Sequence, residues 1–144
     1  MTRGNHRLLA ELGAPRHTFQ SDRVHLRIWF PNDALVVQRL EGHADLEVIS
    51  VMLRHLDDQL ARGTKLAIFD DFEELVSYDS DARIAITDWA KEHLPALSTM
   101  AILTRSKLVS MGTAVANLAL GGRLRAYTNR ARFEAALAAE LRRD

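Results

Sequence analysis

Cysteine is absent from this sequence of 144 residues. Its absence excludes a disulfide scaffold, a thiolate zinc site, an iron–sulfur cluster and a cysteine nucleophile. An excess of charge is also missing, because 19 basic side chains balance 19 acidic ones. A balanced chain has no overall attraction to nucleic acid, so we expect no nucleic-acid partner.

Long apolar runs are missing as well. The longest nearly uncharged stretch, residues 108–122, contains Ser110, Thr113 and Asn117 and is shorter than the ~20 apolar residues that a membrane span requires. The apolar stretch near the N-terminus stops at Glu11, too early for the core of a secretory signal. The sequence therefore predicts a cytoplasmic protein without a membrane span.

The signatures of several common enzyme classes are not found either. The sequence has no Walker loop, no glycine-rich dinucleotide turn and no nucleophile-elbow spacing. Its six histidines show no paired spacing typical of metal ligands. We therefore expect a non-catalytic protein with no catalytic residues, no metal and no cofactor.

Strand and helix patterns alternate along most of the chain. The expected strands are short runs of apolar or alternating residues, and they cover residues 24–30, 34–40, 65–69, 100–103 and 124–127. The expected helices have apolar residues at steps of three and four, and they cover residues 46–60, 80–93, 106–120 and 129–142. Turn residues at 31–33 join the first two strands as a hairpin, and Asp45 is the expected N-cap of the first helix.

This order, ββαβαβαβα, predicts an α/β fold with a mostly parallel five-stranded sheet, an opening antiparallel hairpin and four helices. Residues 23–144 are expected to form a single domain. Residues 1–22 are predicted to be a partly ordered leader, because Gly4, Gly13 and Pro15 interrupt any periodicity.

Two adjacent carboxylates, Asp70 and Asp71, follow the apolar run 65–69, at the edge where open α/β sheets place their sites. With Asp79 or Asp81 they offer the oxygen ligands that Mg²⁺ prefers, so a magnesium-dependent phosphoacceptor is one interpretation. A receiver domain of that kind also needs a third aspartate and a later lysine after other strands, and neither is present. The sequence therefore favours the interpretation that Asp70 and Asp71 are loop residues.

The segment that leads into the second helix is the other candidate site. The free amides at a helix start favour an anion, and Ser80 is placed where its hydroxyl is able to cap them. One interpretation is that Asp79 or Ser80 is simply the N-cap. The alternative is an exposed hydroxyl that another protein modifies or recognises.

The sequence resembles the STAS domain family, named for sulfate transporters and anti-sigma factor antagonists, over roughly residues 23–141. In that family the opening hairpin ends in a glycine before the first helix, as Gly42 does here. A buried strand and an acidic loop then lead to an aromatic or apolar residue followed by Asp-Ser, which residues 78–80 match. Residues 102–106 match a later strand and its serine-containing turn.

The resemblance implies a STAS-like fold and a regulatory role similar to that of an anti-sigma factor antagonist. It places Ser80 on the serine that a partner kinase phosphorylates, and that kinase is often also the anti-sigma factor. The expected partner-binding residues are Asp79, Ser80, Asp81, Ala82 and Arg83. The chain is interpreted as a diverged member, because the acidic Asp81 and Ala82 replace a small hydroxyl residue and a glycine.

The third predicted helix suggests an alternative function. It is apolar on most of its circumference, and Gly112 with Ala116 forms an edge of small residues suited to close contact. Such a helix is consistent with a homodimer face or with a pocket for a small apolar ligand, as in a carrier or sensor. The residues expected at that face or pocket are Trp89, Met111, Gly112 and Val115, with Met52 and Met100 as further lining residues.

Overall fold

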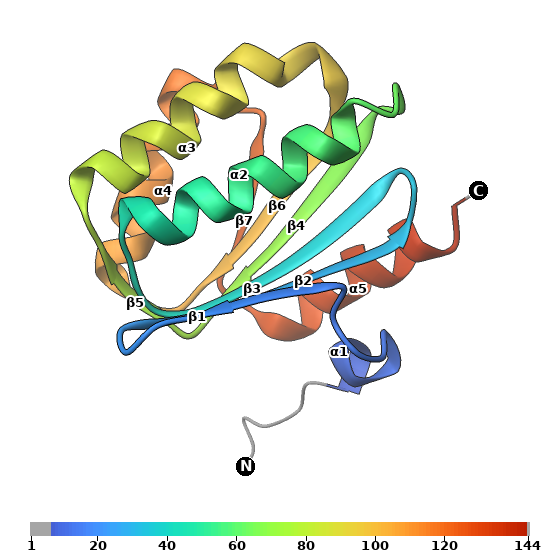
Figure 1. Cartoon of the computed structure of the whole chain (residues 1–144), viewed down its shortest axis with the longest axis horizontal. Helices are drawn as coiled ribbons and strands as arrows, with labels where there is room; N and C mark the ends of the chain where they lie inside the picture. The colour runs from blue at the N-terminus through green and yellow to red at the C-terminus, as the bar shows by residue number, and fades with distance from the viewer. Residues whose placement is uncertain (1–6, 144) are drawn as a thin grey trace.

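A computed structural model describes residues 7–143 of the chain (Figure 1). The strands are β1 (His17–Gln20), β2 (Val24–Asn32), β3 (Leu35–Ala44), β4 (Leu66–Phe72), β5 (Leu75–Tyr78), β6 (Leu97–Thr104) and β7 (Leu124–Tyr127). The α-helices are α1 (Arg7–Glu11), α2 (Leu46–Leu60), α3 (Ser80–His93), α4 (Lys107–Ala119) and α5 (Arg130–Leu141). A short 3-10 turn, η1 (Leu94–Ala96), follows α3.

One mixed sheet runs through the molecule in the order β1-β2-β3-β4-β6-β7. The pairs β1–β2 and β2–β3 are antiparallel, whereas β3–β4, β4–β6 and β6–β7 are parallel. Strand β5 lies off this path and pairs in parallel with the end of β3. The opening antiparallel hairpin and the parallel remainder agree with the predicted α/β arrangement.

The predicted numbers of strands and helices were wrong. The described residues form seven strands rather than five and five α-helices rather than four. Part of the expected leader contributes α1 and the edge strand β1, which pairs with β2 from His17 to Gln20; residues 1–6 of that leader lie outside the described residues. Strand β5 occupies residues that were expected to form a connecting loop.

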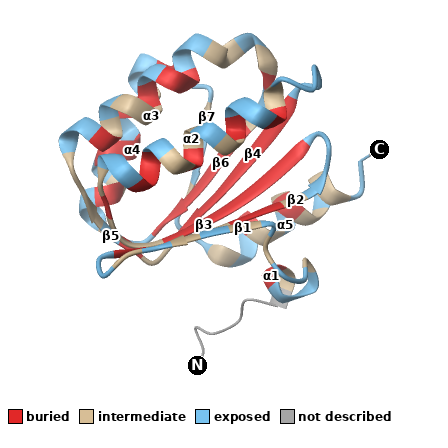
Figure 2. Cartoon of the chain, in the orientation of Figure 1, coloured by how far each residue is buried: buried red, intermediate tan, exposed pale blue. Residues whose placement is uncertain are grey.

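Helices cover both faces of the sheet (Figure 1). Helices α2, α3 and α4 lie on one face, and α1 and α5 lie on the other. The two sets of buried side chains are separate: Met52 and Ile68 belong to the core under α2–α4, whereas Phe69 and Phe133 belong to the core under α5. Because each face is covered, every residue of β4 is buried, and Figure 2 shows the central strands buried along most of their length.

The helix starts are fixed by side chains in the chain's local sequence. The predicted N-cap Asp45 is confirmed, because its carboxylate accepts a hydrogen bond from the Val48 amide at 3.0 Å. Ser106 caps α4 and Asn129 caps α5 in the same way. Helix α3 differs from these three, because its N-cap residue, Asp79, makes no side-chain cap hydrogen bond.

Candidate functional site

The start of α3 presents an exposed serine. Asp79 is turned toward β3, where its carboxylate lies 2.9 Å from His43 Nε2, and this contact replaces a cap on the helix amides. Ser80 follows as the first helical residue and is exposed, as is Asp81. The surface is therefore an uncapped helix start with a serine hydroxyl between two carboxylates.

The other predicted docking residues divide between surface and core. Ala82 is buried and lines an internal cavity, so it is not available to a partner. Arg83 is partly exposed and lies one helical turn after Ser80. Of the five residues expected to bind a partner, Asp79, Ser80, Asp81 and Arg83 reach the surface.

The prediction that Asp70 and Asp71 are loop residues was wrong, because β4 continues through both to Phe72. Adjacent strand residues point to opposite faces of a sheet, and the two carboxylates accordingly have different partners. Asp70 meets Gln38 on the face of α2–α4, whereas Asp71 meets Arg39 and Arg130 on the face of α5. They do not converge on one ion, and residues 7–143 contain no group of three or more potential ligands placed to hold a metal.

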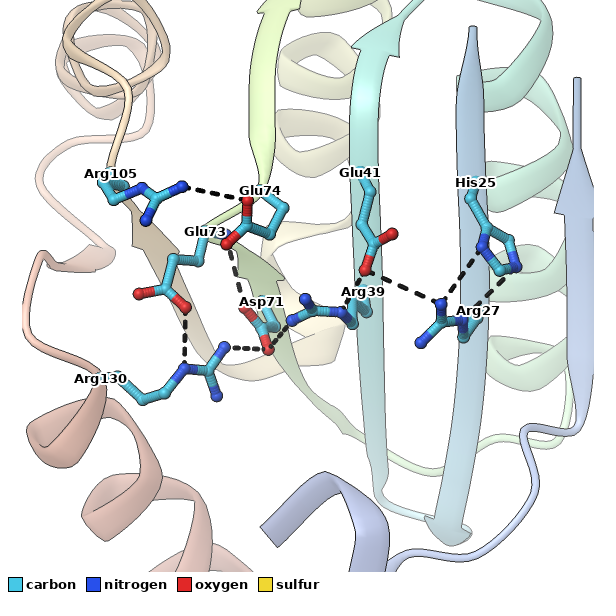
Figure 3. A network of polar contacts seen from close by, with 9 residues as sticks. All are labelled: His25, Arg27, Arg39, Glu41, Asp71, Glu73, Glu74, Arg105 and Arg130. Atoms are coloured by element: carbon cyan, nitrogen blue, oxygen red, sulfur yellow. Dashed lines mark hydrogen bonds and ion pairs between the residues drawn. The ribbon is translucent and has the colours of Figure 1, made fainter. Parts of the chain in front are cut away.

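Asp71 is the centre of a charge network on the α5 face (Figure 3). It is 0% exposed and accepts hydrogen bonds from Arg39 Nη1 at 2.9 Å and from Arg130 Nη2. Burial acts to lower the pKa of Arg130, but hydrogen bonds and charges of Asp71, Glu73 and Glu134 outweigh it and raise that pKa. Every strong donor here has a carboxylate partner, so we interpret the network as structural.

A cavity of about 120 Å³ lies between the sheet and helices α2, α3 and α4. Its wall is mostly apolar and includes side chains from Met52 on α2, Ile68 on β4, Trp89 on α3 and Met100 on β6. For scale, a cavity of ~150 Å³ in a protein core accommodates benzene. The space is therefore of the size of a single aromatic ring.

Two polar side chains project into this cavity from neighbouring strands. Gln38 on β3 and Asp70 on β4 are register partners, and Gln38 Nε2 donates to Asp70 Oδ1 at 2.6 Å. Burial raises the pKa of Asp70 to about 7, with the Gln38 hydrogen bond opposing the shift and the Asp71 charge adding to it. A carboxyl group that changes protonation near neutral pH thus faces an apolar space.

The structure divides the residues expected at an apolar pocket or dimer face. Trp89 and Gly112 line the cavity, as do Met52 and Met100. Met111 and Val115 point outward and are exposed. Position 112 has room only for glycine, because a Cβ there would collide with the Tyr78 hydroxyl.

Sequence reasoning missed Gln38 and its pairing with Asp70. A signal was present, because Gln38 is a polar residue that directly follows the apolar run 34–37 in a strand expected to be buried. A buried polar residue requires a partner, but the partner lies 32 positions away in the sequence, and local patterns do not reveal it.

The outer side of α4 carries an exposed apolar stripe that we call the α4 stripe. Its members lie at helical steps along one side of the helix; they are Leu108, Met111, Val115 and Leu118. Leu118 is 85% exposed and Met111 67%. Val76 on β5 is also exposed, and its carbonyl accepts a hydrogen bond from Ser106 at the start of α4. Exposed apolar side chains are therefore present both on α4 and on β5, the strand that precedes Ser80.

No family model matches the sequence, and no curated protein matches it. Among solved structures, the chain is similar to an uncharacterized protein of the DUF3478 family with a SpoIIAA-like fold from Shewanella loihica PV-4. The likeness has a TM-score of 0.60 at 18% sequence identity and covers 83% of this chain and 98% of that one. In the described part of the chain, no helix combines the length and apolar character needed to cross a membrane.

Proposed function

We propose that this chain, which has the SpoIIAA-like fold of the STAS domains, is a non-catalytic regulatory module that docks onto a partner protein. The proposed docking surface consists of the start of α3 and the α4 stripe. The observation that carries the proposal is the exposed Ser80 at an uncapped helix start, on a helix that packs against α4 and its exposed apolar stripe. An apolar patch bordered by polar residues is typical of a protein-interaction site.

Ser80 is the proposed switch within this surface. Phosphorylation adds about −1.5 to −2 charges, and the amides of the α3 start together with Arg83 would attract that charge. Asp79 and Asp81 would repel it, as would acidic groups of the partner. We therefore propose that phosphorylation of Ser80 by a partner kinase weakens docking by changing the charge of the surface.

The test is a binding measurement with a purified partner that has been recovered by cross-linking from the source cells. Ser80→Trp should weaken the partner's affinity at least about tenfold, because a bulky side chain obstructs a central contact. Ser98→Trp is the matched control, since Ser98 is an exposed serine at the start of β6, at the opposite end of the strands. Equal affinity for the two variants would contradict the docking surface.

The α4 stripe requires its own variant, because a second copy of the chain is the competing occupant. Met111→Asp places a charge on the stripe without disturbing the cavity, since Met111 is exposed. If the stripe binds the partner, this variant loses partner binding while sedimentation velocity reports the same mass for both proteins. A dimer that dissociates in Met111→Asp would assign the stripe to self-association instead.

A second candidate function is the binding of a small apolar ligand, as in a carrier or sensor. The cavity of about 120 Å³ under α2–α4 favours it. Native mass spectrometry of freshly purified protein should show an added mass that is lost on denaturation. Ala116→Leu, which fills the cavity, should abolish the added mass, whereas Ala114→Leu on the exposed side of the same helix should retain it. An added mass retained by both variants would contradict binding in the cavity.

A further inference from the structure

The cavity contains a hydrogen-bond acceptor that the protein itself does not use. Gln38 is 0% exposed, and its amide nitrogen donates to Asp70, but its Oε1 accepts no hydrogen bond from any residue in the described range 7–143. Buried polar atoms are nearly always paired, because an unpaired one loses its hydration without compensation. The unpaired Gln38 Oε1 therefore lowers the free energy of unfolding, unless a molecule bound in the cavity donates a hydrogen bond to it.

Other polar side chains of the wall do not supply the missing donor. The hydroxyls of Thr87 and Thr113 line the same cavity, but each donates to a carbonyl of its own helix, Arg83 O at 2.8 Å and Val109 O at 2.9 Å. The Gln38–Asp70 pair is thus the buried polar feature of the wall that remains available to a bound molecule, whereas Tyr78 and Arg83 are partly exposed. It lies on the sheet, and the apolar wall faces it from the helices.

We propose that the cavity binds a small neutral aromatic alcohol, of the size of phenol, whose hydroxyl hydrogen-bonds to the Gln38–Asp70 pair. This inference rests on the second candidate function and specifies its ligand class. The hydroxyl proton is donated to Gln38 Oε1, and the ring lies among apolar side chains such as Met52, Trp89 and Met100. The volume of the cavity limits the ligand to about one ring.

The charges around the cavity favour a neutral ligand over an anion. A carboxylate-bearing ring would place its charge beside the carbonyl of Gln38 and the carboxyl group of Asp70. Asp71 adds negative charge from the other face of the sheet, and Arg83, the cationic side chain of the wall, is on α3 and partly exposed. Benzoate is therefore expected to bind more weakly than phenol at neutral pH.

The probes are phenol and toluene, which have nearly the same shape and differ by a hydroxyl and a methyl group. Binding is followed by NMR of protein labelled with ¹³C at the methionine methyl groups. Met52 and Met100 line the cavity and report on binding, whereas the exposed Met111 serves as an internal control. We expect phenol to shift the Met52 and Met100 signals and to bind about tenfold more tightly than toluene.

Gln38→Met keeps the length of the side chain and removes the acceptor. In this variant phenol should lose most of its tenfold advantage over toluene, because its hydroxyl no longer finds the acceptor of Gln38 and only the Asp70 carboxyl remains. Gln59→Met is the matched control, because Gln59 is also buried but donates to Asp33 O at 2.9 Å, away from the cavity wall. The control should retain the tenfold preference for phenol.

The outcomes separate the two proposals. If toluene binds to the wild-type protein as tightly as phenol does, the hydroxyl recognition is wrong while ligand binding stands. If no probe shifts Met52 or Met100, the cavity holds water at most and the second candidate function fails as well. The comparison of probes in the wild-type protein decides the inference even if Gln38→Met does not fold.

Discussion

Asp70 and Asp71 are neighbours in the chain, but their side chains lie on opposite faces of the sheet. Asp70 faces the cavity and hydrogen-bonds to an uncharged amide, whereas Asp71 faces α5 and is held between two guanidinium groups. Burial of a carboxyl group disfavours its charged form unless a cation compensates. The pair shows how the pleat of one strand gives identical side chains opposite roles.

The raised pKa of Asp70 predicts a dependence of stability on pH. In the unfolded chain this group ionises near its ordinary pKa of 3.8, whereas in the folded protein it keeps its proton up to about pH 7. Its contribution to the free energy of unfolding is therefore largest below about pH 4 and is lost as the pH rises to about 7. Asp70→Asn removes this dependence.

Urea unfolding of both proteins between about pH 4.5 and 8 tests this expectation. The stability of Asp70→Asn relative to the wild type should rise with pH, by about 3 kcal/mol over this range, and level off above about pH 7. Asp58→Asn, at an exposed position of α2, should follow the wild-type curve. A constant difference between wild type and Asp70→Asn would show that Asp70 ionises normally in the folded state.

The role of a residue was predictable from the sequence where its partner lies only a few positions away in the chain. The N-cap role of Asp45 was predictable because its acceptor and the Val48 amide lie three residues apart. The burial of Asp70 and Asp71 was not, because their partners Gln38 and Arg39 come from a different strand. Carboxylates after an apolar run are typical of a loop, and only the long-range pairing keeps them in the strand.

At the scale of elements, Gly42 fixes the close approach of β3 to the start of β2. Its φ of +105° is in the left-handed region, and a Cβ there would collide with the carbonyl oxygen of Arg23. The same carbonyl accepts a hydrogen bond from the His43 amide at 3.0 Å. The end of β3, which also pairs with β5, is therefore held where an added methyl group has no room.

We expect Gly42→Ala to lower the free energy of unfolding by about 2 kcal/mol or more, as measured by urea denaturation. Gly63→Ala provides the comparison, because Gly63 also has a positive φ of 87° but nothing within 4 Å of its would-be Cβ. That variant should lose only about 1 kcal/mol. Equal losses for the two would mean that backbone conformation alone, and not the contact with Arg23, determines the cost.

The longer helices were predictable with their bounds, whereas two of the short strands were not. Helices α2 and α3 were predicted with their observed bounds, because periodic apolar positions extend over several turns. Strands β1 and β5 have four residues each and were expected to be leader and loop. Their strand conformation depends on pairing with β2 and β3, which local patterns do not reveal.

At the scale of the whole molecule, the charge network attaches α5 to the sheet. Asp71 on β4 joins Arg130 on α5 to Arg39 on β3. Asp71→Asn removes the buried negative charge and leaves both guanidinium groups in place. We expect a loss of about 3 kcal/mol in the free energy of unfolding, since other carboxylates still pair with each arginine.

Chemical denaturation followed by circular dichroism measures this loss. Glu140→Gln is the control, because Glu140 pairs with the exposed Arg143 at 3.8 Å on the surface of α5, and such a pair contributes less than about 1 kcal/mol. Asp71→Asn within about 1 kcal/mol of the wild type would show that the network does not anchor α5.

The cavity under α2–α4 gives the two sides of the sheet different compressibility. A space of about 120 Å³ per molecule corresponds to about 70 mL per mole, which is within the range of volume changes that accompany unfolding. Hydrostatic pressure should therefore act first on the layer that contains Met52 and Met100. The layer around the fully buried Phe133 should respond at higher pressure, so the two faces of the sheet are expected to lose their packing at different pressures.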